Sequence, residues 1–198
     1  MLPSYDAAAV AQVMGIGFVR SAGDAATGDG TGGRPGTPEG APRRRAVAEG
    51  DGWAIRLTRP DGRREGDAGA AVSPPSPVLI ERAVETGLPR QALRHVAEWL
   101  AGGDASKVAR FEWGVVPKTT LDRRTTRLSP EESERTERVA RLAVHARRAL
   151  GTEAEARAFL TTPHPRLDGR TPLDAAMTDL GTRRVEAVLN ALEYGLAL

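Results

Sequence analysis

The chain has 198 residues, with 28 basic and 26 acidic side chains, a formal net charge of +2 and no cysteine. This length allows one or two small domains. The balanced charge excludes a polycation that binds nucleic acid over its whole surface, so a nucleic-acid site would need a local group of cations. The lack of cysteine excludes disulfides, thiolate metal ligands and a cysteine nucleophile, and it agrees with a reducing, cytoplasmic location.

Residues 1–20 contain the apolar run AAAVAQVMGIGFV, from Ala7 to Val19. A secretory signal has basic residues before its apolar core, and a membrane span needs about 20 apolar residues. This run meets neither requirement. We therefore predict a short amphipathic N-terminal helix and no contact with a membrane.

Residues 21–77 hold 12 glycines and 7 prolines, one third of the segment. An aperiodic share above about 25–30% indicates low complexity, because such a chain buries too little apolar surface to offset its ordering entropy. We predict a largely disordered linker. Trp53, Ile55 and Leu57 alternate with other residues as in a strand, but the sequence shows no partner for that strand.

Residues 78–127 change to helical spacing of apolar residues. Pro89 and Pro117 stand at first-turn positions, Asp104 is placed as an N-cap, and glycines follow the helices. We predict three or four short helices, in SPVLIERAVETG, LPRQALRHVAEWLAGG, DASKVARFEWG and VPKTTLDRRTTR. Short helices joined by tight turns are typical of a helix-turn-helix domain.

Residues 128–198 predict a small helical bundle. Ser129 is placed to cap its first helix, with Pro130 at the first position and Glu132 closing a capping box. TEAEARAFL, TPLDAAM and LGTRRVEAVLNALEYG predict three further helices, with Thr152 and Thr171 placed to cap the first two, and TPHPRLDGR predicts a loop. The predicted fold class is therefore all-α, a helix-turn-helix domain followed by this bundle.

Basic residues concentrate between Pro117 and Arg127. A helix that turns about 100° per residue, with Leu121 toward the core, directs Thr119 and Arg123 away from it. In a helix-turn-helix, the second helix reaches base edges and flanking cations bind phosphates. The predicted DNA-binding residues are Lys118, Thr119, Thr120, Arg123, Arg124 and Arg127. An ordinary solvated helix end is the alternative explanation.

The sequence contains no pattern of a catalytic or metal site. His95, His145 and His164 lie in separate predicted elements without a metal-ligand spacing, and neither a P-loop nor a nucleophile-elbow motif is present. The acidic run PEESERTE is typical of the solvated start of a helix. We therefore predict that the protein is not an enzyme and binds no metal or cofactor.

Three stretches occur in the order found in a known family. GLPRQALRHVAEWL is similar to the opening helix of an Xre-like domain, PKTTLDRRTTRLSPEESER to a recognition segment, and the LDGRTPL loop with the terminal YG to a toxin-binding domain. Through them residues 78–198 resemble the Xre/MbcA/ParS antitoxins, partners of RES-domain toxins in bacterial type II toxin–antitoxin systems, and ParS most of all. The family often has Trp-Leu where this chain has Phe159-Leu160.

The resemblance implies that residues 128–198 bind a RES-domain toxin and occlude the active site of this enzyme, which consumes NAD or transfers ADP-ribose. It also implies binding to operator DNA as a homodimer within a toxin–antitoxin hetero-oligomer, since one helix-turn-helix reads only half of a site. The toxin-binding residues that it implies are Leu167, Gly169, Arg170, Thr171, Pro172, Glu193, Tyr194, Gly195 and Leu198.

Three alternatives stay open at this point. The chain could be a stand-alone dimeric transcriptional regulator, or an adaptor whose helix-turn-helix has lost its affinity for DNA. The apolar tail YGLAL is expected to contact the toxin, but a frayed terminus would have the same composition.

Overall fold

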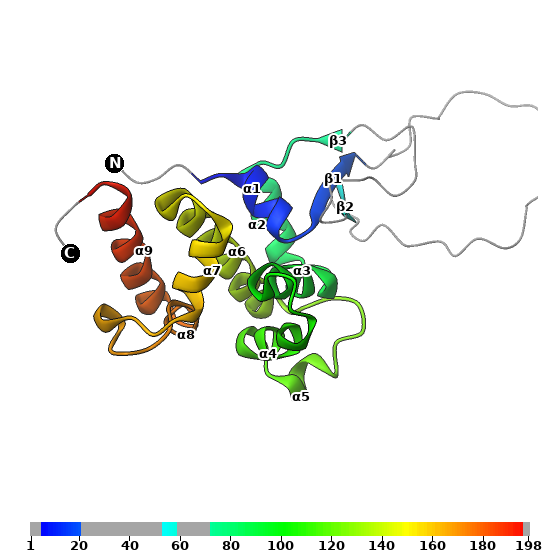
Figure 1. Ribbon diagram of the computed structural model, residues 1–198. Coiled ribbons are helices and arrows are strands. Elements are labelled where there is room, and N and C mark those ends of the chain that lie inside the picture. The colour runs from blue at the N-terminus through cyan, green and yellow to red at the C-terminus, as the bar shows by residue number, and fades with distance from the viewer. Residues whose placement is uncertain (1–4, 21–52, 59–71, 196–198) are drawn as a thin grey trace, which may run out of the picture.

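The computed structural model describes residues 5–20, 53–58 and 72–195 (Figure 1). These residues are mostly helical, which confirms the predicted all-α class. A small antiparallel sheet with the strand order β2-β1-β3 joins the helices near the N-terminus. The predicted disordered linker lies largely outside the described residues, and so does Leu198 among the predicted toxin contacts.

The N-terminal segment forms a helix and a strand, so the prediction of a single helix over this run was wrong. Helix α1 (Ala7–Val13) starts at Asp6, whose side chain accepts a hydrogen bond from the Ala9 amide at 2.9 Å. Gly15 then adopts a φ of +61°, which residues with a Cβ avoid, and strand β1 (Ile16–Arg20) follows. The glycine turn therefore divides the apolar run.

Strand β1 is the partner that the sequence did not reveal for β2 (Trp53–Leu57). The two strands pair antiparallel with Phe18 opposite Ile55, and both of these side chains lie in the core. The short strand β3 (Val72–Ser73) pairs with the other edge of β1. Because the partners are far apart in the sequence, the alternation within one strand could not identify them.

The next part of the chain contains α2 (Pro77–Glu85), α3 (Arg90–Ala101), α4 (Ala105–Val115) and α5 (Lys118–Leu121). Helices α3 and α4 pack through a small cluster of Ala97, Ala101, Val108 and Phe111. Asp104 caps α4 as predicted, because its carboxylate accepts a hydrogen bond from the Ser106 amide at 3.1 Å.

Helix α5 is a single turn, so the prediction of a helix through the whole basic segment was wrong. Beyond Leu121 the chain runs back and pairs with the turn between α2 and α3. The Arg90 amide donates to the Thr126 carbonyl oxygen at 3.0 Å, and the Leu128 amide donates to the Leu88 carbonyl oxygen at 2.9 Å. These long-range backbone bonds hold the segment that the sequence predicted as the end of the helix.

The C-terminal bundle contains α6 (Pro130–Leu150), α7 (Glu153–Thr161), the short 3-10 helix η1 (Pro165–Leu167), α8 (Pro172–Ala175) and α9 (Asp179–Glu193). The predicted capping box is confirmed, because the Ser129 amide donates to the Glu132 carboxylate at 2.7 Å and the Glu132 amide donates to Ser129 Oγ at 3.3 Å. Helix α6 contacts α1, α2 and α3 as well as α7 and α9 (Figure 1). One core therefore runs through both halves.

Helix α9 begins against α8 at a position where only glycine fits. A Cβ on Gly181 would lie 1.9 Å from the Ala175 carbonyl oxygen. Thr178 caps α9 by accepting a hydrogen bond from the Gly181 amide at 3.1 Å. This close approach sets the position of α9 relative to α8 and to the loop before it.

Candidate functional site

The predicted DNA-binding segment lies at α5 and the residues after it, at one edge of the described molecule (Figure 1). Lys118, Thr119 and Arg123 are exposed there, and Thr120 is half-buried. The Lys118 ammonium lies 5.2 Å from the ring centre of Trp113, a cation–π contact on an indole that is 45% exposed. We call Lys118, Thr119 and Arg123 the α5 tip.

The other two predicted DNA-binding cations, Arg124 and Arg127, are held in intramolecular contacts. Arg124 hydrogen-bonds to both carboxylate oxygens of Glu132 at 2.9–3.1 Å. Glu132 is buried and is the same residue that closes the capping box of α6. Arg127 donates to the Thr86 carbonyl oxygen at 2.8 Å, and burial lowers the pKa of its guanidinium. Both arginines therefore join the segment after α5 to neighbouring helices.

The predicted toxin-binding loop between α7 and α8 is held in one shape by its own backbone and by α9. The His164 amide donates to the Arg170 carbonyl oxygen at 3.0 Å, which closes the loop. Asp168 has a left-handed φ of +58°. Arg184 of α9 donates to the Asp168 carboxylate and to the Arg166 carbonyl oxygen, both at 2.7 Å. This arginine also holds the pKa of Asp168 below its usual range.

Within this loop the predicted contact residues divide into buried and exposed ones. Leu167 and Pro172 are buried, so their side chains anchor the loop in the core. Thr171 accepts an amide hydrogen bond and caps α8, as its position in the sequence predicted. Gly169 and Arg170 are exposed. Arg170 is therefore the long side chain of this set that a partner could reach.

The end of α9 is tied to α6 through Glu193. Its carboxylate accepts hydrogen bonds from Arg148 at 2.7 and 3.0 Å and lies 3.2 Å from His145 Nε2. The Arg148 guanidinium holds the pKa of Glu193 below its usual value, and burial lowers the pKa of His145. Tyr194 and Gly195, which follow, are exposed. Glu193 thus fixes the end of α9, and Tyr194 is the side chain presented there.

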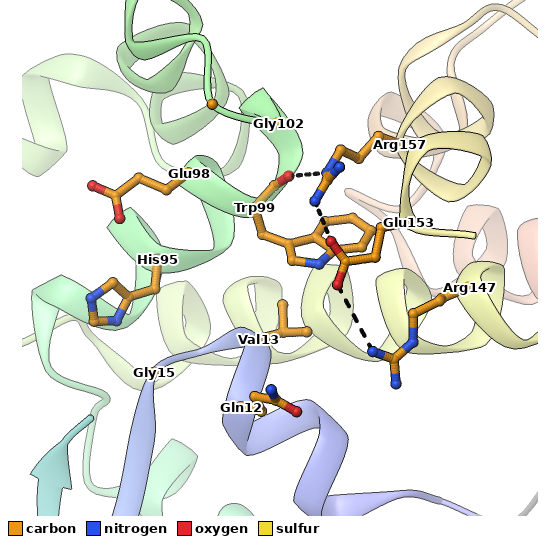
Figure 2. A pocket seen from close by; sticks show the side chains of 11 residues that line it. Gln12, Val13, Gly15, His95, Glu98, Trp99, Gly102, Arg147, Glu153 and Arg157 are labelled. Atoms are coloured by element: carbon orange, nitrogen blue, oxygen red, sulfur yellow. Dashed lines mark hydrogen bonds and ion pairs between the residues drawn. The ribbon is translucent and has the colours of Figure 1, made fainter. Parts of the chain in front are cut away.

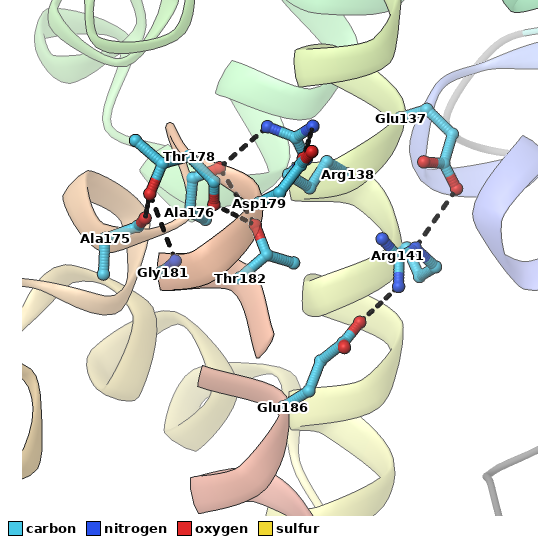
Figure 3. Close-up of polar contacts among 10 residues, drawn as sticks. All are labelled: Glu137, Arg138, Arg141, Ala175, Ala176, Thr178, Asp179, Gly181, Thr182 and Glu186. Carbon is cyan, nitrogen blue, oxygen red and sulfur yellow. Dashed lines mark hydrogen bonds and ion pairs between the residues drawn. The ribbon is translucent and has the colours of Figure 1, made fainter. Parts of the chain in front are cut away.

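The sequence patterns missed a second group of charged contacts, which joins α6 to α9 (Figure 3). Arg141 lies 3.5 Å from the Glu137 carboxylate and also pairs with Glu186 of α9. Tyr5 donates a hydrogen bond to Glu137 at 2.9 Å, and burial raises the pKa of this carboxyl. Arg138 reaches the first turn of α9 in a similar way. Apart from Glu137 and Arg141, which lie four residues apart on α6, the partners come from separate elements, so no local spacing could have identified them.

A cavity of about 280 Å³ lies where α1, α3, α6 and α7 meet (Figure 2). Three of its charged side chains, Arg147, Glu153 and Arg157, pair with one another. Arg157 pairs with Glu153 and donates to the Trp99 carbonyl oxygen at 2.6 Å, while its guanidinium lies 5.1 Å from the Trp99 ring centre. Arg147 lies 3.9 Å from Glu153. These contacts join α7 to α3 and to α6.

Within the ranges that the structure describes, no three histidine, aspartate or glutamate side chains are placed to share a metal ion. None of the described helices has the length and apolar character needed to cross a membrane. The exposed side chains among the predicted contact residues lie at the α5 tip, on the loop before α8 and at the end of α9.

The C-terminal half is similar to known proteins. Residues 145–195, from the second half of α6 to the end of α9, match the family of the antitoxin Xre/MbcA/ParS C-terminal toxin-binding domain. The chain is also 32% identical over 87 residues to the Antitoxin Xre of Pseudomonas putida strain KT2440, an alignment that covers 42% of this chain and 55% of that protein. The chain thus spans about half the length of this curated relative. By this match, residues 145–195 are similar to the toxin-binding domain of the Xre/MbcA/ParS antitoxins.

Proposed function

We propose that the chain neutralises a toxin by binding it through the C-terminal bundle, and that this toxin is a RES-domain enzyme whose active site the bundle covers. The observation that carries the proposal is the match of residues 145–195 to a toxin-binding domain. The proposed substrate of the toxin, NAD or an ADP-ribose acceptor, comes from the resemblance of residues 78–198 to antitoxins of RES-domain enzymes.

The geometry of the bundle supports a binding role. Arg184 fixes the loop before α8, and Arg148 fixes the end of α9. A surface that is already ordered loses little conformational entropy on binding, which favours tight association. Arg170 and Tyr194 extend from these fixed positions and are exposed. Arginine and tyrosine are among the residues that contribute most to protein interfaces.

Co-expression of the full chain with a RES-domain protein encoded beside it tests the proposal. The products would be separated by size-exclusion chromatography and assayed for NAD consumption. We expect a stable complex in which NAD consumption is suppressed. An enzyme that elutes apart from the folded chain would favour a stand-alone regulator, and an enzyme that stays active inside the complex would contradict occlusion of its active site.

We also propose that the α5 tip binds operator DNA and that the chain binds it as a homodimer. The supporting observation is that Lys118, Thr119 and Arg123 are exposed and close in the sequence, and that neither cation forms an ion pair with a described carboxylate. Cations and hydroxyls in such a group suit phosphate and base contacts.

A mobility-shift assay with DNA from upstream of the chain's own gene tests operator binding. Binding should weaken steeply as salt rises from about 50 to 200 mM, because phosphate contacts release counterions. Lack of a shifted band at the lowest salt, with a folded chain, would favour an adaptor that has lost its affinity for DNA.

A further inference from the structure

Helix α9 has one face in the core and one face that no described element covers. It packs mainly on α6, α8 and η1 and lies at an edge of the described molecule (Figure 1). Val185 and Leu189 are fully buried on the core side. On the opposite side Leu180 is 73% exposed and Tyr194 is 52% exposed. Leu180 at the start of the helix and Tyr194 at its C-cap therefore leave apolar surface in solvent on this side.

The exposed residues lie along one line of the helix. Seven residues make nearly two turns, so Leu180, Ala187 and Tyr194 point in almost the same direction. At about 1.5 Å per residue the line is about 21 Å long. Ala187 and Ala191 lie between the two large side chains, so a partner could approach the middle of the helix closely. We call Leu180, Arg183, Ala187, Ala191 and Tyr194 the outer face of α9.

The charge of this region is positive. Arg183 follows Leu180 by three residues and is exposed, and Arg170 is exposed on the neighbouring loop. Neither guanidinium pairs with a described carboxylate. Arg184 brings the loop beside α9, because it donates to the Arg166 carbonyl oxygen at 2.7 Å. A partner would therefore meet an apolar line with cations next to it.

The acidic residues of α9 do not offset this charge. Each of them pairs with an arginine of α6: Asp179 with Arg138, Glu186 with Arg141, and Glu193 with Arg148 (Figure 3 shows the first two pairs). The contacts that fix α9 to the bundle thus use its carboxylates and leave the arginines of the outer side without a partner.

We propose that the toxin docks on the outer face of α9 and on Arg170, and that it covers them with an apolar groove bordered by acidic side chains. The inference rests on the proposed function. The outer face lies entirely within residues 145–195, which match a toxin-binding domain. A second copy of the chain is a poorer occupant, because it would bring another set of unpaired arginines to the contact.

Replacement of Leu180 by glutamate tests the proposal. Val78→Glu on α2 is the matched control, because Val78 is also an exposed apolar residue on a helix, at 55%. The purified full-length variants would be titrated with the RES-domain toxin in a calorimeter. We expect Leu180→Glu to raise the Kd at least about 30-fold, as at an interface hot spot, and to restore NAD consumption. Val78→Glu should change the Kd less than about threefold.

The outcomes separate this inference from the proposed function. A wild-type chain that binds no toxin would overturn both. A wild-type chain that binds, together with equal Kd values for Leu180→Glu and Val78→Glu, would overturn only the docking surface. A Leu180→Glu variant that turns a dimer into a monomer but keeps its Kd for the toxin would assign the outer face to a second copy.

A charge-reversal variant keeps the test decisive if Leu180→Glu does not fold. Arg170→Glu with Arg183→Glu alters two exposed side chains that form no described ion pair. We expect a Kd at least about tenfold higher and a weaker salt dependence than that of the wild-type chain, because the lost contacts are electrostatic. A Kd and salt dependence equal to those of the wild-type chain would overturn the acidic border of the groove.

Discussion

The α5 tip and the outer face of α9 each include one member of a pair of adjacent arginines, and in each pair the two side chains have different surroundings. Arg123 is exposed, whereas Arg124 hydrogen-bonds to Glu132. Arg183 is exposed, whereas Arg184 binds the loop before α8. In both of these pairs, one arginine is held by contacts within the fold and the other is exposed.

The two regions differ in what surrounds the free cation. The α5 tip is one helical turn with threonines next to its cations, which suits contacts to phosphates and base edges. The outer face of α9 is about 21 Å long and includes two exposed residues with large apolar surface. Large apolar and aromatic anchors next to arginine are typical of protein interfaces. The comparison agrees with the two proposals, a nucleic acid at the first region and a protein at the second.

Replacement of Gly181 by alanine should have the largest effect on stability. It should disturb the outer face of α9 but not the α5 tip. The new Cβ would lie 1.9 Å from the Ala175 carbonyl oxygen, so α8 and α9 must separate. We expect a loss of about 2–3 kcal/mol in the free energy of unfolding, measured in urea. Toxin binding should weaken more than operator binding.

Gly114→Ala in α4 is the control for this substitution. No heavy atom lies within 4 Å of a Cβ at Gly114, and alanine is a better helix former than glycine by about 1 kcal/mol. This variant should be at least as stable as the wild-type chain. Equal stability of the two alanine variants would contradict the close packing of α8 and α9.

The adjacent arginines of the basic segment offer a sharper test with a smaller effect. Arg123→Ala should lower operator affinity about tenfold and leave the unfolding transition unchanged, because a lost base contact costs roughly 1–3 kcal/mol. Arg124→Ala should shift the unfolding transition to lower denaturant, because the buried Glu132 loses its partner. If both variants fold and their operator affinities fall equally, the proposal that Arg123 contacts DNA while Arg124 stabilises the fold would be contradicted.

The smallest expected effect is a pH dependence of stability at His145. Burial lowers its pKa in the folded chain, although Glu193 and Glu186 oppose this and Arg148 adds to it. As pH falls through about 6.5, the unfolded chain therefore binds a proton more readily than the folded chain, and stability decreases. His145→Gln should flatten this decrease between about pH 7.5 and 5.5 in urea titrations.

Above about pH 7.5, the free energies of unfolding of the wild-type chain and of His145→Gln should change with pH in the same way, because the imidazole is neutral in the folded and unfolded states. A decrease below pH 7 that is as steep in His145→Gln as in the wild-type chain would assign the effect to other groups.

The starts of the helices were predictable because their signals are local. Ser129 and Glu132, or Thr171 at the start of α8, find their hydrogen-bond partners within three residues. The exposed position of Leu180 could also have been found, because it lies about 140° around the helix from the buried Val185.

The errors of prediction share one cause, which is pairing with residues far away in the chain. β1 was predicted as helix because its partner strand begins at Trp53, beyond the glycine-rich segment. The segment after α5 was predicted as helix because its backbone partners, Leu88 and Arg90, belong to an earlier turn. No periodicity within either segment contains this information.

The amino-acid sequence by itself determined the helical class, the caps of α4, α6, α7 and α8, and the motifs shared with the antitoxin family. Only the tertiary structure decided which cations are free for a partner. Arg124 and Arg184 pair with carboxylates that are 8 and 16 residues away in the chain, so their guanidinium groups are already engaged. Such pairs depend on how the elements pack, because an ion pair forms only where folding brings the two charges within a few ångströms.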